Sequence, residues 1–160
     1  MQIRHSCRED IPAILEIYDR ARRFMAENGN PNQWKDAGPR LSDIEEDIAS
    51  QTGYICEDEG RIAAVFMFGP GPDPIYEETK DIWLNDEPYY VVHRIAGSGI
   101  KKGAGLFCLS WCISQCGNIR IDTHKDNIPM RSLIEKVGFK YCGPTRAYDG
   151  TARMAYHKIP

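Results

Sequence analysis

The chain has 160 residues, of which 42% are hydrophobic, and a formal net charge of −3 at pH 7. This length suffices for one domain with its own core, and the weak acidic balance gives no general reason to expect nucleic acid or an anionic membrane as a partner. No run approaches the roughly 18 consecutive apolar residues of a membrane helix, and the first residues lack the apolar stretch of a signal peptide. We therefore expect one domain over residues 1–160, in the cytoplasm.

The first part of the chain predicts a short strand followed by a long helix. Residues 2–6 form an extended run, and the acidic, Pro-bearing segment after Arg8 is typical of a helix start. Apolar side chains then recur at helical spacing to about residue 27. The next segment, 28–39, is rich in Gly, Pro and Asn, so we expect a loop that leaves Trp34 exposed.

In the middle and at the end of the chain, helices and strands mix without strict alternation. Ser42-Asp-Ile-Glu is a capping-box pattern that opens a second helix to about residue 50, whereas the prolines of 69–74 exclude regular structure there. The other predicted elements are strands at 54–56 and 61–68, a strand at 89–96, a helix at 103–116, a strand at 119–123, a helix at 129–137, and strands at 139–142 and 152–159. This order predicts an α+β fold, one mixed sheet with helices on its faces.

The six cysteines predict neither disulfides nor a metal site. None forms a Cys-x-x-Cys pair, and a chain of this size has no need of covalent staples. Cys108, Cys112 and Cys116 recur every four residues, as small apolar residues do on one side of a helix. We expect reduced thiols and no metal, with a metal or redox protein as the weaker alternative.

A glycine-rich turn follows the strand predicted at 89–96 and opens the next helix. It reads Gly97-Ser-Gly-Ile-Lys-Lys-Gly-Ala-Gly-Leu-Phe. Glycines let the backbone approach a ligand closely, and the first N–H groups of a helix have no partners within it. Together with the helix dipole and the side chains of Lys101 and Lys102, these donors predict an anion site. A turn that needs glycine only for its geometry is the alternative.

Two nucleotide-binding patterns do not fit this turn. A Rossmann fingerprint requires a third glycine and a place after the first strand, and a P-loop requires Ser or Thr after Gly-Lys. The six residues from Gly97 read G-S-G-I-K-K, and the turn lies in the middle of the chain. Nucleotide-dependent dehydrogenases and NTPases are therefore disfavoured.

The segment Ile100-Lys-Lys-Gly-Ala-Gly resembles the pyrophosphate-binding motif of GNAT acetyltransferases, Gln/Arg-x-x-Gly-x-Gly/Ala. Asn127-Ile-Pro-Met-Arg-Ser-Leu-Ile-Glu-Lys-Val-Gly-Phe resembles the second family motif, Asn-x-x-Ala-x-x-Leu-Tyr-x-x-x-Gly-Phe, at the same spacing. The similarity of the motifs covers residues 89–145. It implies the GNAT fold, with a central, mostly antiparallel mixed sheet, and an N-acetyltransferase that takes its acetyl group from acetyl-CoA.

Two positions depart from the family pattern. Ile100 stands where the first motif has Gln or Arg, which affects phosphate affinity only slightly, since backbone donors carry the pocket. Ile134 stands where the second motif has the tyrosine that often protonates the departing thiolate. The resemblance therefore leaves the proton donor open.

The turn and the resemblance together predict the acetyl-CoA site. The resemblance implies that the backbone at Ile95 and Ala96 binds pantetheine and polarises the acyl carbonyl, a role that suits backbone amides. Asn127 is expected to contact pantetheine, with a helix cap as an equal alternative, and Arg131 is a candidate phosphate ligand unless it is a solvated surface arginine. The predicted phosphate turn consists of Gly97, Lys101, Lys102, Gly103, Ala104, Gly105 and Leu106.

His93 is the candidate general base. It lies two residues before Ile95, so on a regular strand both side chains point to the same face. An imidazole can accept a proton from an ammonium near neutral pH, although a buried histidine bonded to backbone is the alternative. For the acid, Tyr141, Tyr148 or a water remain open.

Aromatic residues in loops and at strand ends are candidates for the acceptor pocket, and others among them belong to the core. The candidates are Trp34, Tyr76, Trp83 and Tyr89. The expected acceptor is a primary amine of a small molecule or a peptide N-terminus. A non-catalytic CoA-binding or regulatory domain of the same fold is the alternative function, and a homodimer is left open.

Overall fold

A computed structural model describes residues 1–35 and 38–160 of the chain. The predicted loop at 28–39 includes residues 36 and 37, which lie outside the described residues. The strands are β1 (Gln2–His5), β2 (Gly53–Asp58), β3 (Arg61–Pro70), β4 (Tyr90–Gly97), β5 (Ile119–Thr123), β6 (Lys140–Arg146) and β7 (Ala152–Lys158). The helices are α1 (Ile11–Glu27), α2 (Leu41–Ala49), α3 (Pro74–Glu78), α4 (Ala104–Gln115) and α5 (Ile128–Lys136), with short 3-10 turns η1 (Arg8–Asp10) and η2 (Lys80–Ile82).

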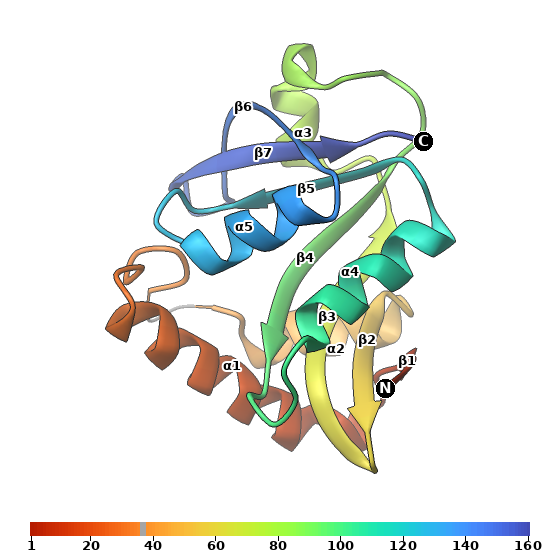
Figure 1. Cartoon of the computed structure of the whole chain (residues 1–160), viewed down its shortest axis with the longest axis vertical. Helices are drawn as coiled ribbons and strands as arrows, with labels where there is room; N and C mark the ends of the chain where they lie inside the picture. The colour runs from red at the N-terminus through yellow and green to blue at the C-terminus, as the bar shows by residue number, and fades with distance from the viewer. Residues whose placement is uncertain (36–37) are drawn as a thin grey trace.

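The strands form one sheet in the order β1-β2-β3-β4-β5-β7-β6. All neighbours are antiparallel except β4 and β5, which run parallel. Helices α4 and α5 cover one face, and α2 lies behind the sheet in the view of Figure 1. The α+β fold expected from the sequence, a mostly antiparallel mixed sheet flanked by helices, is confirmed.

Apolar clusters cover both faces of the sheet. The larger cluster joins β3, β4 and β5 to α4 and α5, with Leu109 and Ile134 fully buried. On the opposite face, α1 and α2 pack over Val65 of β3, and α3 packs over Val91 of β4. The cysteine spacing is explained by this packing, because Cys108 and Cys112 point from α4 into the larger cluster.

The structure differs from the sequence prediction at several places. The prediction that 69–74 has no regular structure is wrong at both ends, because β3 extends to Pro70, which pairs with Tyr90, and α3 begins at Pro74. The rest of α3 and η2 lie in 75–82, for which no element was predicted. The cap of α2 is Arg40 rather than Ser42, because the N–H of Arg40 donates to the carboxylate of Asp43. Trp34 is half-buried, because its ring packs edge-on against Tyr18.

A bulge in β4 changes the direction of its side chains. Val65 pairs with Ala96 but Met67 pairs with His93, so β4 carries one more residue than β3 over this stretch. Arg94 occupies the left-handed region at φ 53°, and its guanidinium bonds to Asp47 of α2. The prediction that His93 and Ile95 share a face is therefore wrong: Ile95 packs with the α4 cluster, and His93 points to the other face.

Candidate functional site

A cleft of about 770 Å³ lies where β4 and β5 separate. The strands pair only from Tyr90 to Val92 on β4, although β4 continues to Gly97 and β5 to Thr123. The cleft walls come from β4, the following turn, α5, α1, α3 and the connection between β6 and β7. The β4 backbone beyond Val92 therefore faces a ligand-sized space where a neighbouring strand would otherwise lie.

The glycine turn forms one end of this cleft. Gly103 caps α4 at φ 85°, a left-handed conformation that glycine adopts without a side-chain clash. Ala104 and Gly105, the first residues of α4, line the cleft, and the N–H groups of this first turn have no partner within the helix. Of the predicted cofactor residues, the described lining includes Ile95, Gly97, Lys101, Gly103, Ala104, Gly105 and Asn127.

Four predicted cofactor residues lie outside the described lining of the cleft. Ala96 is buried under α1 and α2, Lys102 is exposed, and Leu106 is half-buried in α4. Arg131 donates to the carbonyl of Lys125. The structure therefore does not bring these four side chains to the cleft, although the backbone of the turn reaches it.

Asn127 has the geometry of a helix cap. Its Oδ1 accepts the N–H of Met130 at 3.2 Å, which confirms the capping prediction for α5. Its Nδ2 donates to Gln33 Oε1 at 2.8 Å. Asn127 also lines the cleft. The pantetheine contact that the resemblance implies is compatible with this position and stays a prediction.

His93 lies in the cleft between two carboxylates. Its Nε2 is 2.7 Å from Asp73 Oδ2, and its Nδ1 is 4.0 Å from Asp122 Oδ2. A carboxylate only accepts hydrogen bonds, so Nε2 is the donor to Asp73, and in the neutral imidazole the lone pair is on Nδ1. His93 thus presents a basic nitrogen toward Asp122.

Asp73 is held firmly in place. It caps α3, with Oδ1 accepting the N–H of Ile75 at 2.9 Å, and its own N–H donates to the hydroxyl of Tyr89. Burial acts to raise the pKa of Asp73, but hydrogen bonds from His93 and others outweigh it, so the pKa lies below its ordinary value. The carboxylate therefore stays ionised beside His93 at neutral pH.

Asp122 is held from the other side by Tyr76 and Arg153. The Tyr76 hydroxyl donates to Asp122 Oδ2 at 2.5 Å, and Arg153 Nε lies 3.6 Å from Oδ1. Tyr76 is fully buried, and this burial, together with the Asp122 charge, raises its pKa well above the ordinary value. Tyr76 therefore remains a neutral donor.

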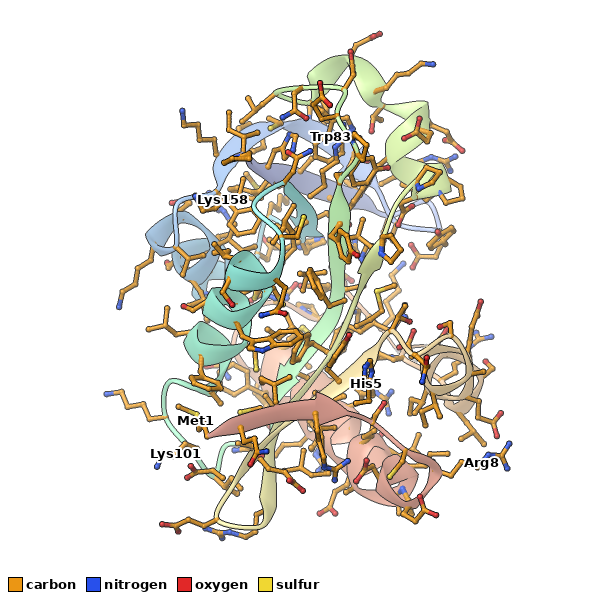
Figure 2. All side chains as sticks on the ribbon, turned by 90° about the vertical axis from the view of Figure 1, so that its right-hand side faces the viewer. Met1, His5, Arg8, Trp83, Lys101 and Lys158 are labelled. Carbon is orange, nitrogen blue, oxygen red and sulfur yellow. The ribbon has the colours of Figure 1, made fainter. Side chains whose placement is uncertain are left out.

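Two of the four predicted acceptor aromatics lie elsewhere. Trp34 and Tyr76 line the cleft, but Trp83 and Tyr89 are buried in the cluster under α3. Their rings enclose the guanidinium of Arg120, which lies 3.7 Å from the centre of Tyr89 and 4.6 Å from that of Trp83. Figure 2 places Trp83 at the end of the molecule opposite Lys101. Both are structural, and Tyr89 also supports Asp73.

The two tyrosines predicted as acids differ in position. Tyr148 lines the cleft, and its hydroxyl donates to Asp73 Oδ1 at 3.3 Å. Tyr141 is 53% exposed on β6, where its ring packs against Tyr156 outside the described lining. The structure therefore does not bring Tyr141 to the cleft. Ile134 is fully buried in the core, so this position offers the cleft no polar group.

Sequence reasoning missed Asp73 and Asp122, the partners of His93. Asp73-Pro74 is a recognisable helix start, since Asp favours the cap and Pro the first helical position, but the prolines around it concealed the short helix. Asp122 alternates with Ile121 on β5, as a side chain on the other face should. Neither residue carried a signal that it would meet His93.

Comparisons with known proteins point to one family. No protein-family model matches the chain. No curated protein matches it either. Among solved structures, a GNAT-family acetyltransferase from Streptococcus agalactiae is 30% identical, with a TM-score of 0.88, covering 99% of this chain and 95% of that one. A GNAT-family acetyltransferase from Listeria monocytogenes is 21% identical, with a TM-score of 0.72, covering 98% and 93%. A GNAT phosphinothricin acetyltransferase from Sinorhizobium meliloti, solved in complex with AcCoA, is 14% identical, with a TM-score of 0.67, covering 98% and 86%.

Proposed function

Because the chain belongs to the GNAT family of acetyltransferases, we propose that it transfers an acetyl group from acetyl-CoA to a primary amine, on a small molecule or at a peptide N-terminus. One observation carries the proposal. The glycine turn lines the same cleft as His93 and its two carboxylates, Asp73 and Asp122, at the place where β4 and β5 separate. The AcCoA bound to the relative from Sinorhizobium meliloti supports acetyl-CoA as the donor.

His93 is the general base of this mechanism. The 4.0 Å between its Nδ1 and Asp122 Oδ2 is too long for a direct hydrogen bond. The amine nitrogen of the acceptor substrate can lie within hydrogen-bond distance of both His93 Nδ1 and Asp122 Oδ2. Asp122 then attracts the ammonium by its charge, while His93 takes the proton. Asp73 stabilises the imidazolium that results, through the hydrogen bond to Nε2.

The neutral amine then attacks the acetyl carbonyl. The C–N bond forms and the C–S bond breaks, and the nitrogen passes its second proton to solvent water as the amide forms. The imidazolium of His93 then returns the first proton to solvent, so one proton is released for each amide formed once the thiolate has taken a proton back. Ile95 lies in the stretch of β4 that has no partner in β5. Its backbone N–H is the donor that the resemblance implies for the carbonyl oxygen, and a fixed amide needs little reorganisation to stabilise that charge. Holding both substrates in one cleft lowers the barrier further.

The departing thiolate takes a proton from Tyr148 or from a water. Burial, followed by the nearby Asp73 charge, raises the pKa of Tyr148 to about 12, so the phenol is protonated at neutral pH and can donate. Its position in the cleft supports this role over that of Tyr141.

A second candidate function follows from Ile134. Because the family tyrosine is replaced by a buried apolar side chain, the chain could bind CoA and regulate without turnover. The placement of His93 between two carboxylates favours the enzyme, since a binding domain has no need of a base in the cleft.

The test is an acceptor screen with acetyl-CoA that follows release of the CoA thiol. The panel contains amino acids, polyamines, aminoglycosides and short peptides. We expect turnover with at least one primary amine. Binding of acetyl-CoA without turnover over the whole panel would favour the regulatory function instead.

With an acceptor found, His93→Ala should lower kcat by about 10²–10⁴-fold, the usual contribution of a general base. The KM for acetyl-CoA should be unchanged, because the glycine turn is untouched. His5→Ala is the matched control, since His5 lies on β1 with its ring against Tyr54. If His93→Ala keeps the wild-type turnover and the acidic limb of the pH–rate profile, the assignment of the base is wrong.

A further inference from the structure

The lysines of the glycine turn are poorly placed to neutralise a diphosphate. Lys101 Nζ lies 2.9 Å from Asp58 Oδ2, and Asp58 also binds the amino group of Met1. Figure 2 shows Lys101 and Met1 close together at this end of the molecule. The bond to Asp58 raises the pKa of Lys101 and holds its ammonium at this carboxylate. Lys102 is exposed and outside the described lining.

A different cation reaches the turn from α1. The guanidinium of Arg20 lies against Gly99: a Cβ placed on Gly99 would be 2.1 Å from Nη1 and 2.1 Å from Nη2 of Arg20. Arg20 is exposed and lines the cleft. Among the described residues, no hydrogen bond or ion pair uses its guanidinium. By contrast, Arg22 is bound to Asp19 and to the Gly38 carbonyl.

We propose that Arg20 is the side-chain cation of the diphosphate subsite, binding the diphosphate of CoA from α1 while the turn binds it through backbone N–H groups. This inference rests on the proposed use of acetyl-CoA. Guanidinium is suited to the task, since its planar donors match phosphate oxygens in pairs. The charge is available in the cleft, whereas that of Lys101 is committed to Asp58.

The composition of the turn agrees with this arrangement. Ile100, 42% exposed, stands where the family motif has Gln or Arg, so the turn lacks its own cation at that position. Gly99, with φ 83°, leaves the space that the Arg20 guanidinium occupies. The absent motif side chain and the open space at Gly99 both favour a cation supplied by another element.

Arg23 provides a matched control on the same helix. It is also exposed, but it lines a separate hollow together with Asp19 and Asn30. Replacing Arg20 or Arg23 by Gln removes one positive charge from α1 in either case. The two variants therefore have the same net charge and differ only in the location of the lost guanidinium.

The experiment measures binding by calorimetry for the wild type, Arg20→Gln and Arg23→Gln. The ligands are CoA, dephospho-CoA, which keeps the diphosphate, and pantetheine, which has no phosphate. Arg20→Gln should raise the Kd of CoA and of dephospho-CoA by about tenfold, as expected for one charge-assisted hydrogen bond. Arg23→Gln should change either Kd by less than about twofold, since an exposed charge outside the site contributes little. Pantetheine should bind all three proteins equally.

Each contrary result is specific. Equal Kd values of CoA for Arg20→Gln and Arg23→Gln would overturn the inference and leave the proposed function intact. A penalty for Arg20→Gln that is present with CoA and absent with dephospho-CoA would assign Arg20 to the 3′-phosphate and overturn the diphosphate subsite. No binding of CoA to the wild type would overturn the proposed function itself. An unchanged thermal midpoint of Arg20→Gln confirms that the variant is folded.

Discussion

Asp73→Asn tests whether the carboxylate beside His93 serves the chemistry. The substitution keeps the size of the side chain and removes its charge. Asparagine also caps helices well, so α3 should keep its first turn and the N–H of Ile75 its acceptor. What changes is the hydrogen bond to His93 Nε2, which is 2.7 Å long in the wild type.

The expected effect follows from that bond. Asp73 is only 7% exposed, so water replaces the lost carboxylate poorly. A hydrogen bond to a charged group contributes about 1.5–3 kcal/mol, and it strengthens as His93 takes the proton of the amine. Losing it from the transition state should lower kcat by about 10- to 150-fold. The KM for acetyl-CoA should stay within about twofold, because Asp73 does not touch the turn.

The assay is steady-state release of CoA thiol with an acceptor identified by the screen. Asp126→Asn is the control, since it removes a carboxylate 3.5 Å from another histidine, His124, that lies outside the described lining of the cleft. Wild-type kcat in Asp73→Asn, with intact folding, would refute the reasoning. If Asp73→Asn lowered the thermal midpoint together with kcat, Asp73 would have a structural role instead.

Two further predictions concern stability. His157 is fully buried; burial, then the charge of Arg120, lowers its pKa to about 4. The unfolded chain therefore binds the proton first as the pH falls below about 6.5, and stability should drop by about 2 kcal/mol between about pH 7 and about pH 5 in urea titrations; His157→Gln should flatten this dependence, and an unchanged slope would contradict it. Asp47→Ala should destabilise the fold by about 3 kcal/mol, because the largely buried Arg94 guanidinium loses its partner. Adding Arg94→Gly should recover part of that loss in the same titration, since glycine accepts φ 53° without strain; no recovery would contradict this.

The regular elements were predictable because their signals are local. Helical periodicity located α1, and the apolar run at 89–96 located β4 to within a residue at each end. The glycines before α4 predicted a turn whose backbone is open to a ligand, and Gly103 and Gly105 line the cleft. In each case, residues close in sequence determine the structure.

The remainder depends on contacts between distant residues. No glycine in the sequence indicates the β4 bulge. The residue with positive φ in the bulge is Arg94, which Asp47 of α2 holds at φ 53°. In the sequence, the lysines next to the turn resemble phosphate ligands. In the structure, Lys101 instead forms an ion pair with Asp58 of β2. Arg20 is the opposite case: its neighbours in the sequence do not indicate that its side chain reaches the glycine turn.

The bulge and the separation of β4 from β5 act together on the site. In a regular sheet, the β4 backbone beyond Val92 would be paired with β5, and an unpaired buried N–H costs about 1–3 kcal/mol. Here β4 turns away, so its free edge faces the cleft, and the bulge directs His93 toward Asp73 and Ile95 toward α4. Arg94 anchors this irregular backbone to α2 through Asp47. The packing of the core therefore leaves the edge of β4 beyond Val92 unpaired with β5 and facing the cleft, and it places His93, the proposed base, beside that edge.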